Sequence, residues 1–279
     1  MKKKIVSLCL VVALLAVAIG GATLAYFTDT DEETNVFTVG NVIIDLIEQE
    51  RKEEVNDDGE TETVLGKFTQ NKHLYPIVGS AQDEKDEFCL PVAKNYVDKV
   101  VTVENEGSEP AYIRAYFAIP SALDDGYETF NAGLNILHFN FGKYKTEDGV
   151  MHDTEDKEWN WKHADGDDEK WNYYETTIDG IKYNVYYADY YQPLAGNATT
   201  ERLINGVYLD KSVNFSKDGS LIAFGKTCTL DEGWNWNAVK CPVFAVAVQT
   251  AGFGSVDEAV TEAFGANYNP WGGTTTNWQ

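Results

Sequence analysis

The sequence predicts a mainly β protein of antiparallel strands, with one or two short helices and long acidic loop insertions. Three observations support this prediction. Short runs rich in Val, Ile, Tyr and Phe recur along the chain, and Gly, Pro and Asn, which are typical of turns, separate them. Asp179-Gly180 joins two such runs and is a strong signal for a tight hairpin. A single segment, residues 255–264, combines a capping box with an apolar helical stripe.

Length and charge limit the classes of function. The chain has 279 residues, which suits one large β domain or two small ones, and a single elaborated domain is the favoured interpretation. It has 45 acidic and 22 basic residues and a formal charge of −23. This charge argues against nucleic acid as a partner, because phosphate groups are bound by Lys and Arg. It is compatible with calcium or with cationic parts of a cell wall, and a solvated acidic surface is the simpler explanation.

The N-terminus has the organisation of an export signal. Three lysines follow Met1, a long apolar segment comes next, and the small residues Thr23 and Ala25 precede a polar stretch. This pattern predicts a signal peptide over residues 1–25 and a mature chain, residues 26–279, that begins at Tyr26. We therefore expect a secreted protein. The alternative is an uncleaved membrane anchor, because the apolar segment is about long enough to cross a hydrocarbon core of roughly 30 Å.

The region around the cleavage site resembles a known family. Residues 20–32, GGATLAYFTDTDE, and residues 35–42, NVFTVGNV, are similar to the start of the camelysin and TasA proteins, which Gram-positive bacteria secrete. Residues 98–114 and 243–253 resemble the same family more loosely. The resemblance implies a jelly-roll-like β-sandwich and processing by a SipW-type signal peptidase. It also implies a structural role at the cell surface or in the biofilm matrix, with the ability to form fibres.

The new N-terminus is a candidate assembly strand. It begins with the aromatic residues Tyr26 and Phe27 and continues through polar residues to Val36. An extended strand here can pair with the sheet edge of another copy and bury both aromatic side chains. The family resemblance points the same way, since fibre-forming relatives are thought to join subunits by strand donation. We therefore expect self-association through this segment, and a flexible leader is the alternative.

The first strand-like segments lie between residues 36 and 119. Residues 36–48 are mostly apolar and predict a strand buried on both faces, with a bulge at Gly40. Residues 49–63 are acidic and polar and predict an exposed loop or hairpin tip. Residues 98–104 and 111–119 are strand-like runs that a Gly- and Pro-containing turn separates. These two runs predict a hairpin.

The second half of the chain continues this pattern. Residues 121–141 predict a short helix followed by a strand, and the runs on either side of Asp179-Gly180 predict a hairpin. Residues 203–210 and 243–250 predict two further strands. The second of these is apolar at almost every position, which fits a central strand covered on both faces.

Residues 143–175 form a charged insertion with several tryptophans. Asp165, Asp167 and Glu169 stand at alternating positions, as the oxygen ligands of calcium often do. The segment lacks the glycine at the sixth position and the acid at the twelfth that an EF-hand loop requires. Calcium is therefore a weak candidate here, and a solvated loop held by its tryptophans is the favoured interpretation.

Two Trp-Asn-Trp repeats suggest a second class of function. In an extended strand both indoles of each repeat lie on one face, so Trp159 with Trp161 and Trp234 with Trp236 are candidates for a sugar-binding platform. This would make the protein a surface module for cell-wall or matrix polysaccharide. Packing of these tryptophans against the sandwich is the favoured alternative.

The mature chain contains Cys89, Cys228 and Cys241, an odd number that prevents complete internal pairing. A disulfide between Cys228 and Cys241 is compatible with an oxidising exterior. Free buried thiols are an equal alternative, and the three residues are too scattered in sequence for a zinc site.

The sequence predicts no catalytic residues and no bound cofactor. Camelysin has been associated with metallopeptidase activity, but HExxH, the motif that places two imidazoles on one helical face, is absent. The four histidines are well separated in sequence: His73, His138, His152 and His163. A zinc peptidase is therefore the third-ranked function, after a structural protein and a carbohydrate-binding module.

Overall fold

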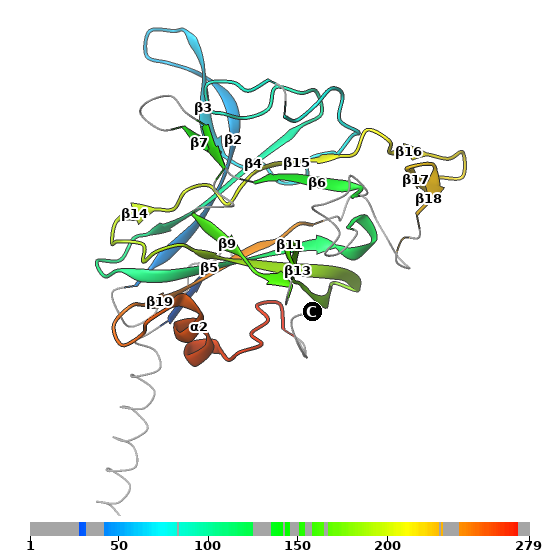
Figure 1. Ribbon diagram of the computed structural model, residues 1–279. Coiled ribbons are helices and arrows are strands. Elements are labelled where there is room, and N and C mark those ends of the chain that lie inside the picture. The colour runs from blue at the N-terminus through cyan, green and yellow to red at the C-terminus, as the bar shows by residue number, and fades with distance from the viewer. Residues whose placement is uncertain are drawn as a thin grey trace, which may run out of the picture.

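The protein is mainly β with antiparallel sheets, as predicted. The computed structural model describes residues 28–31, 42–82, 84–124, 135–141, 143–145, 151–153, 158–164, 167–228, 230 and 240–272. Two six-stranded sheets lie face to face (Figure 1). Sheet I has the order β1 (Thr28–Asp31), β19 (Val243–Gln249), β5 (Ala111–Pro120), β13 (Ile181–Tyr190) and β12 (Tyr174–Ile178), and β9 (Trp159–Trp161) also pairs with β13. Sheet II has the order β3 (Thr61–Lys67), β2 (Ile44–Val55), β4 (Val97–Asn105), β15 (Ile204–Leu209) and β6 (Leu137–Phe141), and β14 (Ala198–Thr199) pairs with β4.

Shorter elements complete the described chain. The 3₁₀ helix η1 (Ser121–Leu123) follows β5, and β6 comes after it, so the predicted helix and strand of this region are both present. Three small sheets lie outside the two large ones: β7 (Lys143–Lys145) with β8 (Met151–Asp153), β10 (His163–Ala164) with β11 (Asp167–Trp171), and β16 (Asn214–Phe215) with β17 (Leu221–Ala223) and β18 (Lys226–Thr227).

The two sheets share one apolar core. Successive side chains of a strand point to opposite faces, so alternate residues of each strand reach the space between the sheets. Val101 and Val103 of β4 and Ile113 and Phe117 of β5 are buried there with residues of the neighbouring strands. Burial of both inner faces in a single core is the arrangement of a β-sandwich.

The strands predicted at residues 98–104 and 111–119 exist, but the predicted hairpin is wrong. β4 pairs with β2 and β15 in sheet II, whereas β5 pairs with β13 and β19 in sheet I. The Asn105 side chain holds the crossing between the sheets: its Nδ2 donates to the carbonyl oxygens of Glu109 at 2.9 Å and Leu194 at 3.1 Å. A turn with Gly and Pro can also connect strands of two different sheets. Here it leads from β4 of sheet II to β5 of sheet I, and both strands bury their inner faces in one core.

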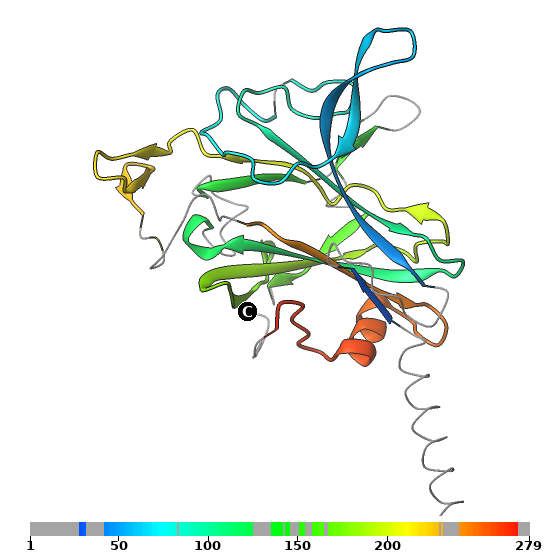
Figure 2. The ribbon, with the colours of Figure 1, turned by 180° about the vertical axis from the view of Figure 1, so that it is seen from behind.

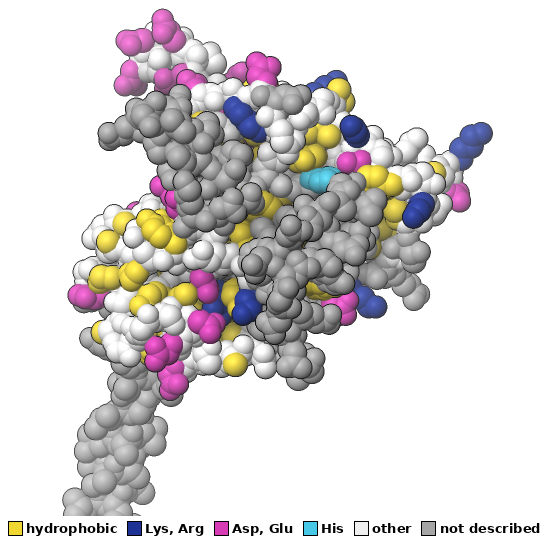
Figure 3. All heavy atoms as spheres, viewed as in Figure 1, with side chains coloured by type: hydrophobic (Ala, Val, Ile, Leu, Met, Phe, Trp, Pro, Cys, Tyr) yellow, Lys and Arg dark blue, Asp and Glu magenta, His cyan; other side chains and the backbone are white. Residues whose placement is uncertain are grey.

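Of the two alternatives predicted for residues 49–63, the hairpin tip is confirmed and the exposed loop is wrong for most of the segment. β2 continues to Val55 and β3 begins at Thr61, so residues 56–60 alone form the hairpin tip. A hairpin that projects beyond the sandwich can be polar on both faces, and its acidic strands therefore lacked the expected apolar alternation. Figure 3 shows acidic side chains gathered at this tip. The exposed acids are Glu53, Glu54, Asp57, Asp58, Glu60 and Glu62.

The predicted tight hairpin and the predicted C-terminal helix are both confirmed. β12 and β13 meet at Asp179 and Gly180, whose φ values of 51° and 83° are those a primed turn requires. Helix α2 (Val256–Phe264) begins after Ser255, whose side chain accepts a hydrogen bond from the Glu258 backbone N–H at 3.2 Å. The helix covers the outer face of sheet I (Figure 2).

Candidate assembly edge and other candidate sites

Strand β1 occupies one edge of sheet I. It pairs with β19 in antiparallel register, from Thr28 opposite Val248 to Asp31 opposite Ala245. Its other side carries no strand among the described residues. Figure 2 shows this short strand beside β19. The predicted assembly segment therefore does contain a strand, and in this structure the strand belongs to the sheet of its own chain.

The strand beneath β1 is apolar on both faces. All seven residues of β19 are buried, as the sequence predicted. Ala245 and Ala247 face the core between the sheets, whereas Val246 and Val248 face the layer under α2. Without β1, the outer backbone groups of β19 would lose their partners beside this apolar surface. An unpaired edge of this kind accepts another extended strand.

The remaining residues of the predicted processing and assembly region lie outside the described residues. These are Thr23 and Ala25 at the cleavage site, and Tyr26, Phe27 and Val36 of the assembly segment. Of the helices in the described parts of the chain, none is both long enough and apolar enough to cross a membrane.

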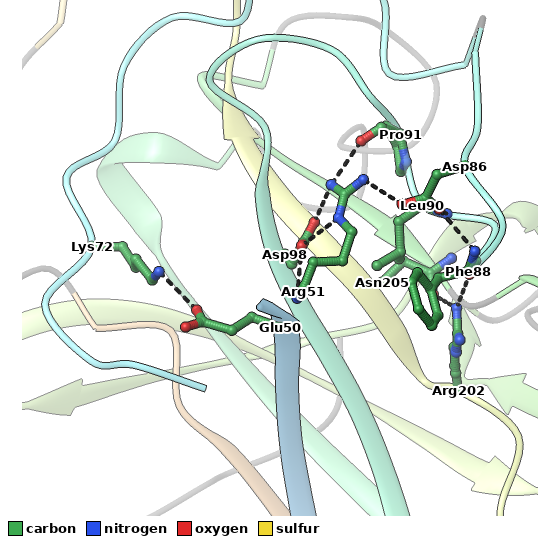
Figure 4. Close-up of polar contacts among 10 residues, drawn as sticks. All are labelled: Glu50, Arg51, Lys72, Asp86, Phe88, Leu90, Pro91, Asp98, Arg202 and Asn205. Atoms are coloured by element: carbon green, nitrogen blue, oxygen red, sulfur yellow. Dashed lines mark hydrogen bonds and ion pairs between the residues drawn. The ribbon is translucent and has the colours of Figure 1, made fainter. Parts of the chain in front are cut away.

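A charged cluster holds a loop over the outer face of sheet II (Figure 4). The Arg51 guanidinium donates from Nε and Nη2 to Asp98 at 2.7 and 2.6 Å, from Nη1 to Asp86 at 2.7 Å, and from Nη2 to the Pro91 carbonyl at 2.9 Å. Burial lowers the pKa of Arg51, but its bonds to Asp98 and Asp86 outweigh this effect and raise the pKa above its usual value. The cluster ties residues 86–98 to β2, which is a structural role.

The same loop has a second attachment point. Arg202 donates from Nη1 to the Phe88 carbonyl at 2.7 Å. The Asp86 side chain accepts from the backbone N–H groups of Phe88 and Leu90 at 3.0 and 2.9 Å, which closes the turn between them. Cys89 lies in this turn with a φ of 62° and is buried. Sequence analysis did not predict this cluster, because its members come from three segments that are distant along the chain.

On sheet I, Arg114 joins α2 to the strands. It donates from Nε and Nη2 to Asp189 at 2.5 and 2.8 Å and from Nη2 to Asp257 of α2 at 2.9 Å. Its guanidinium carbon lies 4.1 Å from the centre of the Tyr187 ring. Burial raises the pKa of Asp189, and Arg114 offsets part of this rise. A single cation within the apolar run of β5 was a signal for this buried pair that the sequence analysis did not use.

The structure corrects the sugar-platform hypothesis for one tryptophan pair. Trp159 and Trp161 do lie on one face of strand β9, but this face points into the core, where they are 0% and 5% exposed. Their indoles are therefore covered by protein and are not accessible to a sugar. For Trp159 and Trp161 the favoured alternative, packing of the indoles against the sandwich, is therefore the correct one. Trp234 and Trp236 lie outside the described residues.

The described residues contain no group of three or more His, Cys, Asp or Glu side chains arranged to hold a metal ion. His138 pairs with Asp210 at 3.3 Å, and burial lowers the pKa of this histidine. His73 lies in the segment after β3, His152 in β8 and His163 in β10. Of the weak calcium candidates, Asp167 and Glu169 lie in β11, whereas Asp165 is outside the described residues.

Cys89, Cys228 and Cys241 are free thiols in this structure. Cys228 and Cys241 both pack against the core between the sheets. Burial raises the pKa of the Cys241 thiol to about 12, which disfavours its reactive thiolate form. The disulfide between these two residues is not formed here and stays a hypothesis.

Comparison with protein families identifies the N-terminal region. The family model described as camelysin metallo-endopeptidase matches residues 1–72. This range contains residues 20–32 and 35–42, the two segments with the stronger resemblance, so the recognition of the camelysin and TasA family is confirmed there. Residues 98–114 and 243–253, which resemble the family more loosely, lie outside the matched range. That range also includes β1 and the β2–β3 hairpin. No curated protein and no solved structure matches the chain in the corresponding comparisons.

Proposed function

We propose that this chain is a secreted structural protein of the cell surface or biofilm matrix that polymerises by exchange of strand β1 between copies. The family match over residues 1–72 supports the surface role. The observation that carries the proposal is the pairing of β1, a four-residue strand near the N-terminus, with the fully buried strand β19.

Strand exchange in this arrangement should cost little free energy. The strand that leaves one sheet and enters the same position in another copy makes the same register of backbone hydrogen bonds, from Thr28 opposite Val248 to Asp31 opposite Ala245. Exchange of an identical element is a low-cost route to association, because few new contacts are needed. Each copy both donates a strand and accepts one, so the contact is head-to-tail and can propagate as a fibre.

Processing would control when exchange begins. A SipW-type signal peptidase that cleaves after Ala25 would leave β1 two residues from a free N-terminus. Before cleavage, the apolar leader would hold this end of the chain at the membrane. After cleavage, the end becomes free to enter another copy, and Tyr26 and Phe27 become available for burial at the new contact.

The test uses the mature protein with residues 26–36 deleted. We expect a folded, soluble monomer that no longer forms fibres in electron micrographs, because the donated strand is missing while β19 remains. A synthetic peptide of residues 26–36 should then bind this variant and raise its melting temperature, whereas a peptide of the same composition in scrambled order should not. Fibre formation by the deletion variant at the rate of the full mature chain would contradict the proposal.

A further inference from the structure

Two segments of opposite charge project from the sandwich. The end of the β2–β3 hairpin, residues 53–62, has six acidic residues and no basic one, and we call it the acidic hairpin. The segment with the small sheet of β16, β17 and β18, residues 211–227, has three lysines and one aspartate, and we call it the basic arm. A positive segment stands out in a chain whose formal charge is −23. Figures 1 and 2 show the two segments at separate places on the molecule, so they do not meet within one copy.

The basic arm has a fixed structure. Leu221 of β17 is buried in the core between the sheets. The Phe224 backbone N–H donates to the Ser212 hydroxyl at 3.0 Å, which ties the end of β17 to the turn after β15. The Asp218 carboxylate accepts from the Ser220 backbone N–H at 3.1 Å, so the single acid of the arm is used within its own turn. The arm therefore holds its lysines on a folded support.

Three exposed lysines give the arm its charge: Lys211, Lys217 and Lys226. Among the residues that the structure describes, none of the three takes part in an ion pair. Phe215 of β16 belongs to the same segment and is 47% exposed. Burial of a large apolar side chain supplies affinity at an interface, and the charges around it select the partner. The arm therefore has the composition of a contact surface for an acidic protein segment.

The acidic hairpin has matching properties. Val55 is 70% exposed, and Glu53 and Glu54 precede it in β2. Glu54 stands directly opposite Glu62 in the β2–β3 register. Like charges in directly opposite positions destabilise a strand pair, so these acids do not serve the stability of the hairpin. Lysines from a partner would relieve this repulsion, and Val55 offers that partner an apolar contact.

We propose that the basic arm of one copy binds the acidic hairpin of a second copy. Phe215 and Val55 are covered at the centre of the contact, and lysines face acids around them. Since two different surfaces meet, the contact is head-to-tail, and each copy keeps a free arm or a free hairpin for a further copy. Strand β1 takes no part, so the contact holds copies together independently of strand exchange and leaves the rate of exchange unchanged. In the alternative role, the hairpin acids protect the edge strand β3 from pairing and need no partner.

Sedimentation velocity of the full mature protein, measured before fibres appear, tests the contact. At about 0.1 M salt the screening length is about 10 Å, which leaves contacts of a few ångströms intact and damps the repulsion between two acidic chains. We expect a reversible dimer fraction that rises with protein concentration under these conditions. At about 1 M salt the screening length falls to about 3 Å, and the dimer fraction should fall at least about fivefold. A protein that stays monomeric at both salt concentrations would overturn the proposal and leave edge protection as the role of the acids.

Charge reversal identifies the two surfaces. The arm variant replaces the three lysines: Lys211→Glu, Lys217→Glu and Lys226→Glu. The hairpin variant replaces three exposed acids: Glu53→Lys, Glu54→Lys and Glu60→Lys. Each variant alone should lose at least about tenfold in dimerisation affinity, because like charges then meet at the contact. An equimolar mixture should recover the wild-type affinity, because the reversed arm faces a reversed hairpin and the native arm faces a native hairpin. A mixture that associates as weakly as each variant alone would contradict the proposal.

A third variant controls for net charge. Glu109→Lys/Glu175→Lys/Glu262→Lys reverses three exposed acids outside the hairpin and has the same formal charge as the hairpin variant. It should dimerise as the wild type does, because both contact surfaces are intact. All the replaced side chains are exposed, so the melting temperatures of the three variants should stay close to that of the wild type. Loss of dimerisation in the third variant as well would show that net charge governs association, which would overturn the proposal.

Discussion

The two sheets of the sandwich end in edge strands that are fixed in different ways. At the edge of sheet II, β3 is joined to β2 through the short tip of residues 56–60, and the two strands pair from Gln49 opposite Lys67 to Val55 opposite Thr61. At the edge of sheet I, β1 pairs with β19 over four residues, and these two strands are far apart in sequence. A strand in a tight hairpin cannot leave its partner without partial unfolding of the hairpin. A strand near a chain end can.

The outer faces of the sheets differ as well. Sheet I is covered by an apolar layer in which Val246 and Val248 pack near Ala259 and Val260 of α2, with the buried pair of Arg114 and Asp189 beside it. Sheet II is covered by a loop that the charged cluster around Arg51 holds in place. Sheet I therefore combines a closely packed outer face with a short edge strand near the chain end, the arrangement that the proposed strand exchange requires.

The largest expected effect on stability comes from Arg114→Met on sheet I. This change leaves the carboxylate of Asp189 buried without its partner, and we expect a loss of roughly 3–5 kcal/mol at pH 7. Burial already raises the pKa of Asp189, and loss of Arg114 raises it further. A raised pKa in the folded state means that stability falls as pH rises through it, so the loss should be smaller at pH 4.5 than at pH 7. Urea unfolding at the two pH values measures this, and equal losses would contradict it.

A smaller loss is expected from Arg51→Ala on sheet II. The Arg51 side chain is 21% exposed, against 5% for Arg114, so water can take the place of its guanidinium beside the two carboxylates after the change. We expect a loss of roughly 2–3 kcal/mol and faster hydrogen exchange in residues 86–98. Lys240→Ala is the control, because this 61%-exposed lysine pairs with the 71%-exposed Asp179 at 2.7 Å. Its loss should stay below about 1 kcal/mol. A larger loss for Lys240→Ala than for Arg51→Ala would contradict the structural role of the Arg51 cluster.

Shortening the β2–β3 hairpin should have almost no effect. Replacement of residues 56–60 by Asn-Gly keeps a favourable turn and removes exposed acids, so stability should change by less than about 0.5 kcal/mol. Fibres should form at the unchanged rate, because this edge does not exchange strands. Loss of fibres in electron micrographs would show that assembly uses the edge of sheet II.

The smallest expected effect is that of zinc, because we predict that the protein has no zinc-dependent proteolytic activity. The described residues hold no cluster of three metal-binding side chains, and the sequence lacks HExxH. Purified protein should therefore leave casein intact with or without zinc. Casein hydrolysis that a chelator abolishes and zinc restores would refute this prediction and support the activity in the family's description.

Local signals in the sequence predicted local structure well. The capping box at Ser255, the Asp179-Gly180 turn and the apolar run of β19 each specify an element through neighbouring residues. The connection between β4 and β5 was mispredicted because a turn with Gly and Pro suits a hairpin and a crossing equally. Which sheet a strand joins depends on distant partners.

The candidate sites were harder to predict for the same reason. The family resemblance indicated that β1 takes part in assembly, but its partner β19 lies more than two hundred residues away. The Trp-Asn-Trp repeat after Glu158 was visible in the sequence, yet alternation alone could not show which face its indoles would take.

A disulfide that locks β1 to its own β19 tests the central claim most directly. Thr28 and Val248 stand opposite each other, and Cα atoms of such antiparallel partners are about 4.5–5.5 Å apart, within the range of a disulfide. The oxidised Thr28→Cys/Val248→Cys mature protein should remain a monomer, because its strand cannot leave. The reduced protein and the two single variants should form fibres at the wild-type rate. Fibre formation at that rate by the oxidised, locked protein would show that β1 is not exchanged during assembly.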